Sequence, residues 1–135
     1  MGSSKFAGIP LEVIKTRKYA TLTAWAVKLL LELAAQYNGP GSNNGDLSAP
    51  FNKRMHRQGW KSKGTLHRAL KELLAIGFVI QTRQGGRNQC SLYALSWQAV
   101  DECIDRKTGL PKHDARPTIT APGTWRDDVD MSRAA

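Results

Sequence analysis

Cationic side chains are the residues of this chain whose types and spacing indicate a chemistry. Residues 51–87 carry nine lysines and arginines but one carboxylate, Glu72, so this window holds a net charge of +8, against +9 for all 135 residues. Such a concentration of positive charge favours a polyanionic partner, such as nucleic acid or an anionic membrane surface. The nine cations are Lys53, Arg54, Arg57, Lys61, Lys63, Arg68, Lys71, Arg83 and Arg87.

One predicted helix, residues 62–76, carries or adjoins four of these cations. Ser62 is a suitable N-cap, and Gly77 is suited to end the helix in the left-handed conformation. A rotation of 100° per residue places leucines on one side and polar residues on the other. The apolar side holds Leu66, Leu70, Leu73 and Leu74. The opposite side holds Gly64, Arg68 and Lys71, with Thr65 and His67 at its margins and Lys61 and Lys63 at the helix entrance.

A basic helix face that begins at a capped N-terminus suits a helix in the major groove of DNA. Side chains reach base edges there, while backbone N–H groups and lysines bind phosphates. The alternative is the solvated face of an ordinary amphipathic helix. A solvated surface would spread its cations more evenly along the chain, so we expect residues 62–76 to recognise DNA.

Residues 23–37 predict the most apolar helix of the chain, with Thr23 as its N-cap. Lys28, Glu32 and Gln36 form its only polar strip. A helix with so narrow a polar strip is buried on most sides. We therefore expect it to be the central core helix; a dimer interface through part of it is the alternative.

Residues 48–56 predict a short helix between the core helix and the basic helix. Ser48 would cap it, and Phe51 and Met55 would face the core. A turn at Gly59 then leads into residues 62–76. A short helix, a tight turn and a longer basic helix are the order of a helix-turn-helix.

A β-hairpin is predicted directly after the basic helix. FVIQT and QCSLYAL read as its two strands, and RQGGRN supplies a Gly-Gly turn with Arg83 and Arg87 near its ends. A basic hairpin tip can reach phosphates or the minor groove, where arginine is favoured by the negative potential. The alternative is an ordinary hairpin with a solvated tip.

The ends of the chain are predicted to be less regular than residues 20–100. Residues 1–19 form an N-terminal segment, with a helical turn from Pro10. SWQAVDECI predicts a turn of helix, and residues 101–135 read as an extended or disordered tail. Trp125 is the only aromatic residue of that tail. It could pack back on the domain, anchor a protein partner or have no role.

The residues from which a metal site or an enzyme would be built have no matching arrangement. The histidines and cysteines are His56, His67, Cys90, Cys103 and His113, and they fit no zinc spacing. Acid–base or nucleophilic catalysis would need carboxylate or His partners that residues 20–96 do not offer. The glycine-rich loop 38–47 follows a helix and lacks the Gly-Lys-Ser/Thr of a phosphate-binding loop. We expect no metal, no cofactor and no enzymatic activity.

The composition fits one globular domain of roughly 100 residues with tails. No apolar run approaches the ~18 residues of a membrane span. The first ten residues lack the apolar segment of a secretory signal. We therefore expect a cytoplasmic protein without a membrane partner, and both cysteines reduced.

The order of two helices, a turn, a basic helix and a two-stranded wing resembles that of winged helix-turn-helix proteins. The resemblance covers about residues 20–96, and SKGTLHRALKELLAIGFVIQTRQGGRN is similar to a recognition helix that runs into a wing. The phrases AQYNG, NNGDLS and TRQGGRN also resemble small helix-turn-helix proteins of bacterial phages, plasmids and integrated elements. The fold class that this implies is mainly α with a small β-hairpin: a three-helix core with a two-stranded wing.

The resemblance implies a bacterial, nucleoid-associated protein that binds double-stranded DNA, as a transcription regulator or a replication- or maintenance-linked factor. By motif match, Lys63, Thr65, His67 and Arg68 would contact bases, and Arg83, Gln84 and Arg87 would lie on the wing. A departure is Gly64 in the first helical turn, which costs up to ~1 kcal/mol relative to Ala. The predicted interface comprises Lys53, Arg57, Lys61, Ser62, Lys63, Thr65, His67, Arg68, Lys71, Arg83, Gln84 and Arg87.

Winged helices also serve as protein-binding modules, so the fold alone does not fix the function. The alternative is therefore a protein-interaction or RNA-contacting module in a larger nucleoprotein or defence-related assembly. A homodimer and a protein partner at the tail around Trp125 stay open.

Overall fold

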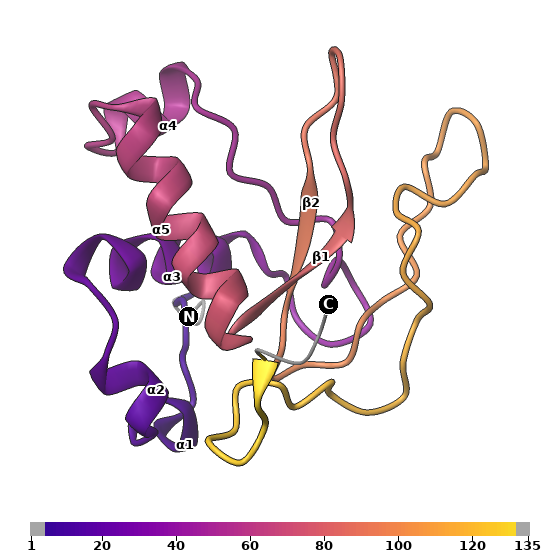
Figure 1. Ribbon diagram of the computed structural model, residues 1–135. Helices are drawn as coiled ribbons and strands as arrows, with labels where there is room; N and C mark the ends of the chain where they lie inside the picture. Colours follow the sequence, from indigo (N-terminus) through magenta and orange to yellow (C-terminus); the bar gives the residue numbers. More distant parts are fainter. Residues whose placement is uncertain (1–4, 132–135) are drawn as a thin grey trace, which may run out of the picture.

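Helix α3 (Ala24–Gln36) contributes more buried residues than any other helix of the computed structural model, which describes residues 5–131 (Figure 1). The Thr23 hydroxyl accepts a hydrogen bond from the Ala26 N–H, as expected of an N-cap. Leu29, Leu30 and Leu33 are fully buried in the core. The predicted core helix is therefore present, but it is less enclosed than expected, because Trp25 and Leu31 are 45% and 44% exposed.

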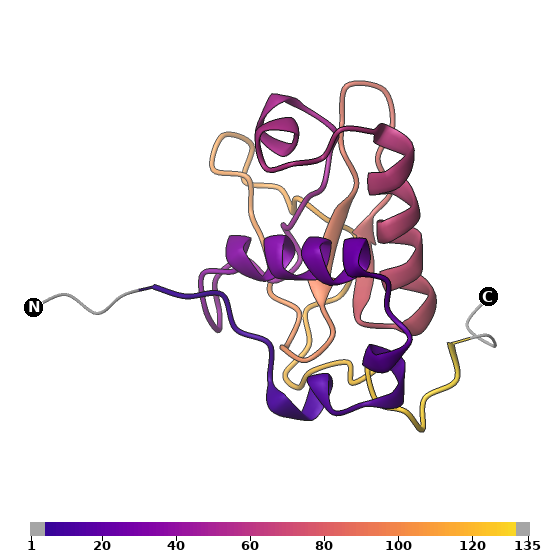
Figure 2. The ribbon, with the colours of Figure 1, turned by 90° about the vertical axis from the view of Figure 1, so that its left-hand side faces the viewer.

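Helix α5 (Lys63–Ile76) packs against α3, and Figure 2 shows the two helices running in different directions. The Ser62 hydroxyl accepts from the Thr65 N–H at 3.3 Å, and Gly77 ends the helix in the left-handed conformation with a φ of 86°. Both predicted caps are confirmed. Leu66, Leu70 and Leu73 bury the inner face of the helix.

Helix α4 (Lys53–Arg57) is shorter than predicted and begins later than residue 48. Asn52 is its N-cap and accepts a hydrogen bond from the Met55 N–H at 3.0 Å. The backbone of Ser48 is instead hydrogen-bonded to the Gln36 side chain, at 2.9 Å through its N–H and 2.7 Å through its carbonyl. The prediction of a Ser48 cap is therefore wrong, because Gln36 holds that residue in an extended conformation.

Two side chains, Phe51 and Met55, were predicted to face the core from this helix, but only one of them does so. Met55 is buried in the core, whereas Phe51 lies before the helix and is 38% exposed. Trp60, in the turn that follows α4, is part of the hydrophobic core and is fully buried. Its indole N–H donates to a Glu32 carboxylate oxygen at 2.6 Å, which fixes the turn to α3.

Strands β1 (Val79–Arg83) and β2 (Leu92–Leu95) form the predicted antiparallel hairpin. Val79 pairs with Leu95 and Gln81 with Tyr93, after which the register shifts between Gln81 and Arg83. Leu47 adds a bridge that the sequence analysis did not predict: its N–H and carbonyl are both hydrogen-bonded to the backbone of Tyr93.

Two short helices precede α3. Helix α1 (Leu11–Ile14) follows Pro10, which confirms the predicted helical turn, and helix α2 (Arg17–Ala20) was not predicted. The Thr16 hydroxyl caps α2 by accepting from the Tyr19 N–H at 3.0 Å. The first four residues of the predicted N-terminal segment lie outside the described residues.

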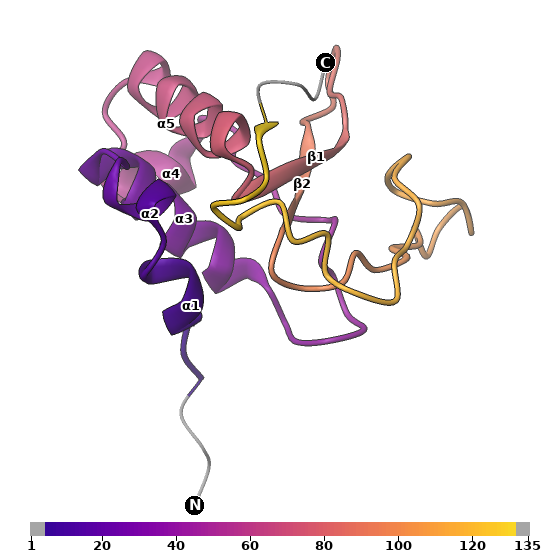
Figure 3. The same cartoon turned by 60° about the horizontal axis from the view of Figure 1, so that its bottom comes forward.

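The chain after β2 consists of turns and irregular segments that are joined to the rest of the molecule at several points. No helix forms in SWQAVDECI: a turn at residues 96–98 leads into extended chain, so that prediction is wrong. Figure 3 shows the later part of the tail passing the end of α5 and β1. Backbone hydrogen bonds join Asp114 to Thr82 and Gly123 to Ser96. The last four residues of the predicted tail lie outside the described part of the chain.

Trp125 packs against the hydrophobic core, which is one of the three roles considered for it. Thr124 beside it donates its hydroxyl hydrogen to the carbonyl of Gly77 at 2.6 Å, at the end of α5. The tail also meets the N-terminal helices, because the Asp127 carboxylate accepts from the N–H groups of Arg17 and Lys18. The tail is thus part of the folded structure up to residue 131.

The described chain therefore combines five helices with a two-stranded antiparallel sheet, an arrangement compatible with a helical core that carries a hairpin. None of the helices in residues 5–131 has the length and apolar character needed to cross a membrane.

Candidate nucleic-acid interface

The outer face of α5 carries the polar residues that the helical periodicity predicted. Arg68, Lys71 and His67 are exposed, on the side opposite the buried leucines. The Arg68 Nη2 donates to the Thr65 hydroxyl at 3.4 Å, one turn earlier. Arg68 therefore does not turn inward against the core, and its guanidinium is available to a partner.

The polar residues of α5 divide between two flanks. Lys63, His67 and Lys71 line a groove between α5 and the hairpin. Thr65 and Arg68 line a smaller hollow on the other flank, beside Trp25 of α3. The residues predicted to contact DNA therefore occupy both sides of one exposed ridge, with Gly64 exposed between them.

The predicted contact cations of α4 and of the following turn precede the N-terminal end of α5. Lys53 and Arg57 are exposed on α4, and Lys61 is exposed in the turn before α5. Figures 1 and 2 both show α4, the first turn of α5 and the tip of the hairpin at one end of the molecule, with α1 and α2 at the other. The geometry thus gathers α4, the start of α5 and the hairpin tip on one side.

One carboxylate, Glu72, lies among these cations and lines the same hollow as Arg68. Residues 47–71 contain no Asp or Glu. Glu72 accepts hydrogen bonds from both the backbone N–H and the hydroxyl of Thr23, each at 2.8 Å. Glu32 pairs with Lys28 at 3.4 Å and accepts from Trp60. The positive potential of this end is therefore set by the lysines and arginines.

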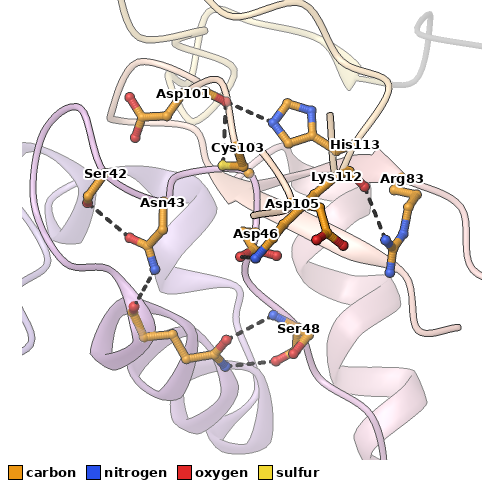
Figure 4. A network of polar contacts seen from close by, with 12 residues as sticks. Ser42, Asn43, Asp46, Ser48, Arg83, Asp101, Cys103, Asp105, Lys112 and His113 are labelled. Atoms are coloured by element: carbon orange, nitrogen blue, oxygen red, sulfur yellow. Dashed lines mark hydrogen bonds and ion pairs between the residues drawn. The ribbon is translucent and has the colours of Figure 1, made fainter. Parts of the chain in front are cut away.

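The predicted contact residues of the hairpin differ in their exposure to solvent. Gln84 and Arg87 are exposed on the far part of the hairpin. Arg83 is half-buried, and its guanidinium donates to the carbonyl of Lys112 at 3.1 Å (Figure 4). It also donates to the carbonyl of Cys90 at 2.7 Å. Arg83 is thus held by hydrogen bonds within the molecule, unlike Arg87.

The groove between α5 and the hairpin has an apolar floor and polar rims. Its volume is about 1030 Å³. The groove is lined by apolar side chains from α5 (Leu66, Leu70 and Leu74), by Tyr93 of β2 and by Phe51. The hairpin rim carries the amide side chains Gln81, Gln84 and Gln89.

Three polar or cationic residues of this region were missed by the sequence analysis. Arg54 is exposed on α4 beside Lys53, and its charge was counted without a contact being assigned. Gln81 and Gln89 line the groove. The alternation of FVIQT, which places Gln81 on the same face as the buried Val79, was the signal for the first of these.

Two further titratable residues, His113 and Cys103, belong to the packing of the tail. His113 is buried, and its Nε2 lies 2.8 Å from the carbonyl oxygen of Asp101. Burial raises the pKa of the Cys103 thiol to about 11, and the nearby carboxylates of Asp46 and Asp101 act in the same direction. Within the described residues, no three His, Cys, Asp or Glu side chains are grouped as metal ligands.

The chain matches no protein-family model, and neither a curated protein nor a solved structure matches it. The geometry of the site and the charge of its residues therefore carry the functional argument.

Proposed function

We propose that this protein binds double-stranded DNA as a winged helix-turn-helix protein, with α4 and α5 as the helix-turn-helix and the hairpin as the wing. The order α3, α4, α5, β1, β2 supports this assignment, and so does the bridge from Leu47 to Tyr93 beside the hairpin. The resemblance to proteins of phages, plasmids and integrated elements supports a role in regulation, replication or maintenance of such an element.

One observation carries the proposal: the exposed cations of α4, α5 and the hairpin tip belong to residues 51–87, where Glu72 is the only carboxylate. The elements that carry them meet at one end of the molecule, where α4, the start of α5 and the hairpin tip lie together. In the proposed complex, the N-terminal half of α5 enters the major groove. Arg68 and Lys63 donate to guanine edges or phosphate, and Thr65 and His67 make secondary contacts.

Phosphate contacts surround this central helix in the proposed complex. Lys53 and Arg57 of α4, Lys61 of the turn and Lys71 of α5 neutralise the DNA backbone. Arg87 at the hairpin tip reaches a phosphate or the minor groove. Because each neutralised phosphate releases counterions, the logarithm of the affinity falls with the logarithm of the salt concentration by roughly 0.9 per contact.

The test is a titration of the whole protein against labelled duplex DNA, single-stranded DNA and RNA of equal length at two salt concentrations. We expect a clear preference for the duplex and a steep loss of affinity at the higher salt concentration. Equal binding of all three, or no binding, would overturn the proposal. Selection of bound fragments from random duplexes would then give the target, and a palindromic target would indicate a homodimer.

The apolar floor of the groove favours one second candidate, a module that binds an acidic protein or RNA. Phe51 and Leu74 offer apolar surface that a phosphate backbone does not require. Retention of RNA, with no affinity for the duplex, would select this candidate in the same titration.

A further inference from the structure

We propose that Arg83 is a positioning residue that sets the direction of the hairpin, and that it does not bind phosphate. This inference rests on the proposed function for its effect on DNA binding, but its structural part can be measured without DNA. It reassigns a residue that the sequence analysis placed among the phosphate contacts.

The Arg83 guanidinium joins three pieces of backbone where the paired strands end and the hairpin tip begins. Arg83 ends β1, at the point where the register with β2 shifts. Its Nη2 donates to the carbonyl of Cys90, on the returning strand, and its Nη1 donates to the carbonyl of Lys112, in the tail. Two donors in one rigid plane thus fix the tail and both sides of the hairpin relative to one another.

The tail segment that receives Arg83 is itself fastened to the rest of the molecule. The Lys112 ammonium lies 2.9 Å from the Asp46 carboxylate, which raises the Lys112 pKa (Figure 4). The Lys112 N–H donates to the carbonyl of Cys103 at 2.7 Å. The Asp114 N–H donates to the carbonyl of Thr82 at 2.9 Å, next to Arg83. Lys112 therefore provides a fixed anchor for the guanidinium.

Beyond Arg83, the hairpin has few contacts of its own. The Gly85 N–H donates to the Ser91 hydroxyl, and Gly86 and Gln89 exchange backbone hydrogen bonds near the tip. A two-stranded hairpin is marginally stable by itself in water. The direction in which the tip carries Arg87 therefore depends on how firmly the base is held.

The guanidinium is also already engaged within the molecule, through both of its terminal nitrogens. Arg83 is half-buried, and its Nε has no hydrogen-bond partner and is shielded from solvent. A phosphate would have to replace two carbonyl acceptors, and the buried charge would lose its partners during that exchange.

The experiment compares Arg83→Lys and Arg83→Gln with Arg87→Lys and Arg87→Gln, in duplex titrations at several salt concentrations. Lysine keeps the charge but lacks the planar fork that places two separate donor nitrogens at these carbonyls. We expect both Arg83 variants to bind duplex DNA about tenfold more weakly, or 1.4 kcal/mol, with an unchanged salt slope. We expect Arg87→Gln to lower the slope by ~0.9 and Arg87→Lys to retain it.

Amide hydrogen exchange of the free protein supplies the readout that does not depend on DNA. The amides of Lys112 and Asp114 should exchange faster in both Arg83 variants and at the wild-type rate in both Arg87 variants. Asp46→Asn, which removes the ion pair with Lys112, should shift the same two amides in the same direction. This variant keeps the test decisive if an Arg83 variant fails to fold.

Wild-type exchange at Lys112 and Asp114 in Arg83→Lys would overturn the inference, as would a salt slope lowered by Arg83→Gln but retained by Arg83→Lys. If the wild-type protein binds no duplex, the proposed function fails, while the exchange rates still decide whether Arg83 holds the hairpin.

Discussion

At the scale of single residues, Arg68 is the side chain placed best to distinguish one base pair from another. It is exposed on the outer face of α5, with only a 3.4 Å hydrogen bond to the Thr65 hydroxyl. We expect Arg68→Ala to cost ~1–3 kcal/mol on a selected target and to reduce the discrimination between target and random DNA. Titrations on both duplexes measure the two effects.

Lys71→Ala is the matched control for Arg68, since it removes a cation from the same helix. Lys71 lies on the flank that lines the groove, where a phosphate contact is proposed. Its loss should weaken target and random DNA alike. An equal loss on both duplexes for Arg68→Ala as well would reduce Arg68 to a phosphate contact.

The two cysteines provide a chemical probe of the groove. Cys90 is exposed and lines it, whereas Cys103 is buried and its pKa is raised to about 11, chiefly by burial. Because the thiolate is the reactive form, Cys103 stays protonated and unreactive at pH 8. We expect iodoacetamide to modify Cys90 first, and bound duplex DNA to slow that reaction, as followed by mass spectrometry.

Cys90→Ser should abolish the fast alkylation and leave Cys103 to react only in denaturant. Rapid modification of Cys103 in the native protein would contradict the packing of the tail. If saturating duplex DNA leaves the alkylation rate of Cys90 unchanged, the DNA does not cover the groove.

At the scale of elements, the helix ends that could be predicted are those encoded by local residues. Ser62 and Gly77 bound α5 through hydrogen bonds and backbone conformation within a few positions of the ends, and Thr23 does so for α3. The start of α4 depends on a contact across 12 positions, between Ser48 and Gln36. No local pattern reports such a contact, so the expected Ser48 cap was wrong.

The same limit applies to the candidate site. The charge and periodicity of α5 indicated which side chains are exposed, because both are properties of one helix. The role of Arg83 depends on Lys112, 29 positions away, in a segment without periodicity. The sequence of a hairpin turn does not distinguish an arginine that faces solvent from one that donates to a backbone carbonyl.

The turn between α4 and α5 makes an element-scale prediction. The fully buried Trp60 donates its indole N–H to Glu32 at 2.6 Å. We expect Glu32→Ala to lower the free energy of unfolding by ~1–3 kcal/mol, because it leaves a buried donor unpaired. Urea denaturation of the wild type and the variant measures this difference.

Glu32→Gln separates the indole bond from the ion pair with Lys28. Glutamine keeps an oxygen acceptor for Trp60 but removes the charge, so its cost should stay below ~1 kcal/mol. Equal losses for the two variants would assign the stabilisation to the Lys28–Glu32 pair instead.

At the scale of the whole molecule, the tail joins parts of the chain that are distant in the sequence. It contacts the end of α5 through Thr124, the hairpin base through Lys112 and the N-terminal helices through Asp127. Composition alone suggested an extended or disordered tail, because little apolar periodicity is present. Single residues, such as the buried Cys103 and the partly buried Trp125, attach it without any periodic pattern.

A chain that ends at residue 100 should therefore be less stable than one that ends at Met131. The shorter chain loses the buried side chains of Cys103 and His113 and the packing of Trp125, and it uncovers Val100. We expect its free energy of unfolding to fall by at least ~2 kcal/mol, about the value of burying one large apolar side chain. Urea denaturation of the two chains measures this difference in the free energy of unfolding.

If the proposed function holds, the shorter chain should also bind duplex DNA more weakly at an unchanged salt slope. Its hairpin has lost the Lys112 anchor, while every proposed phosphate contact remains. Equal stability and equal affinity of the two chains would show that α3, α4, α5 and the hairpin hold their positions without the tail.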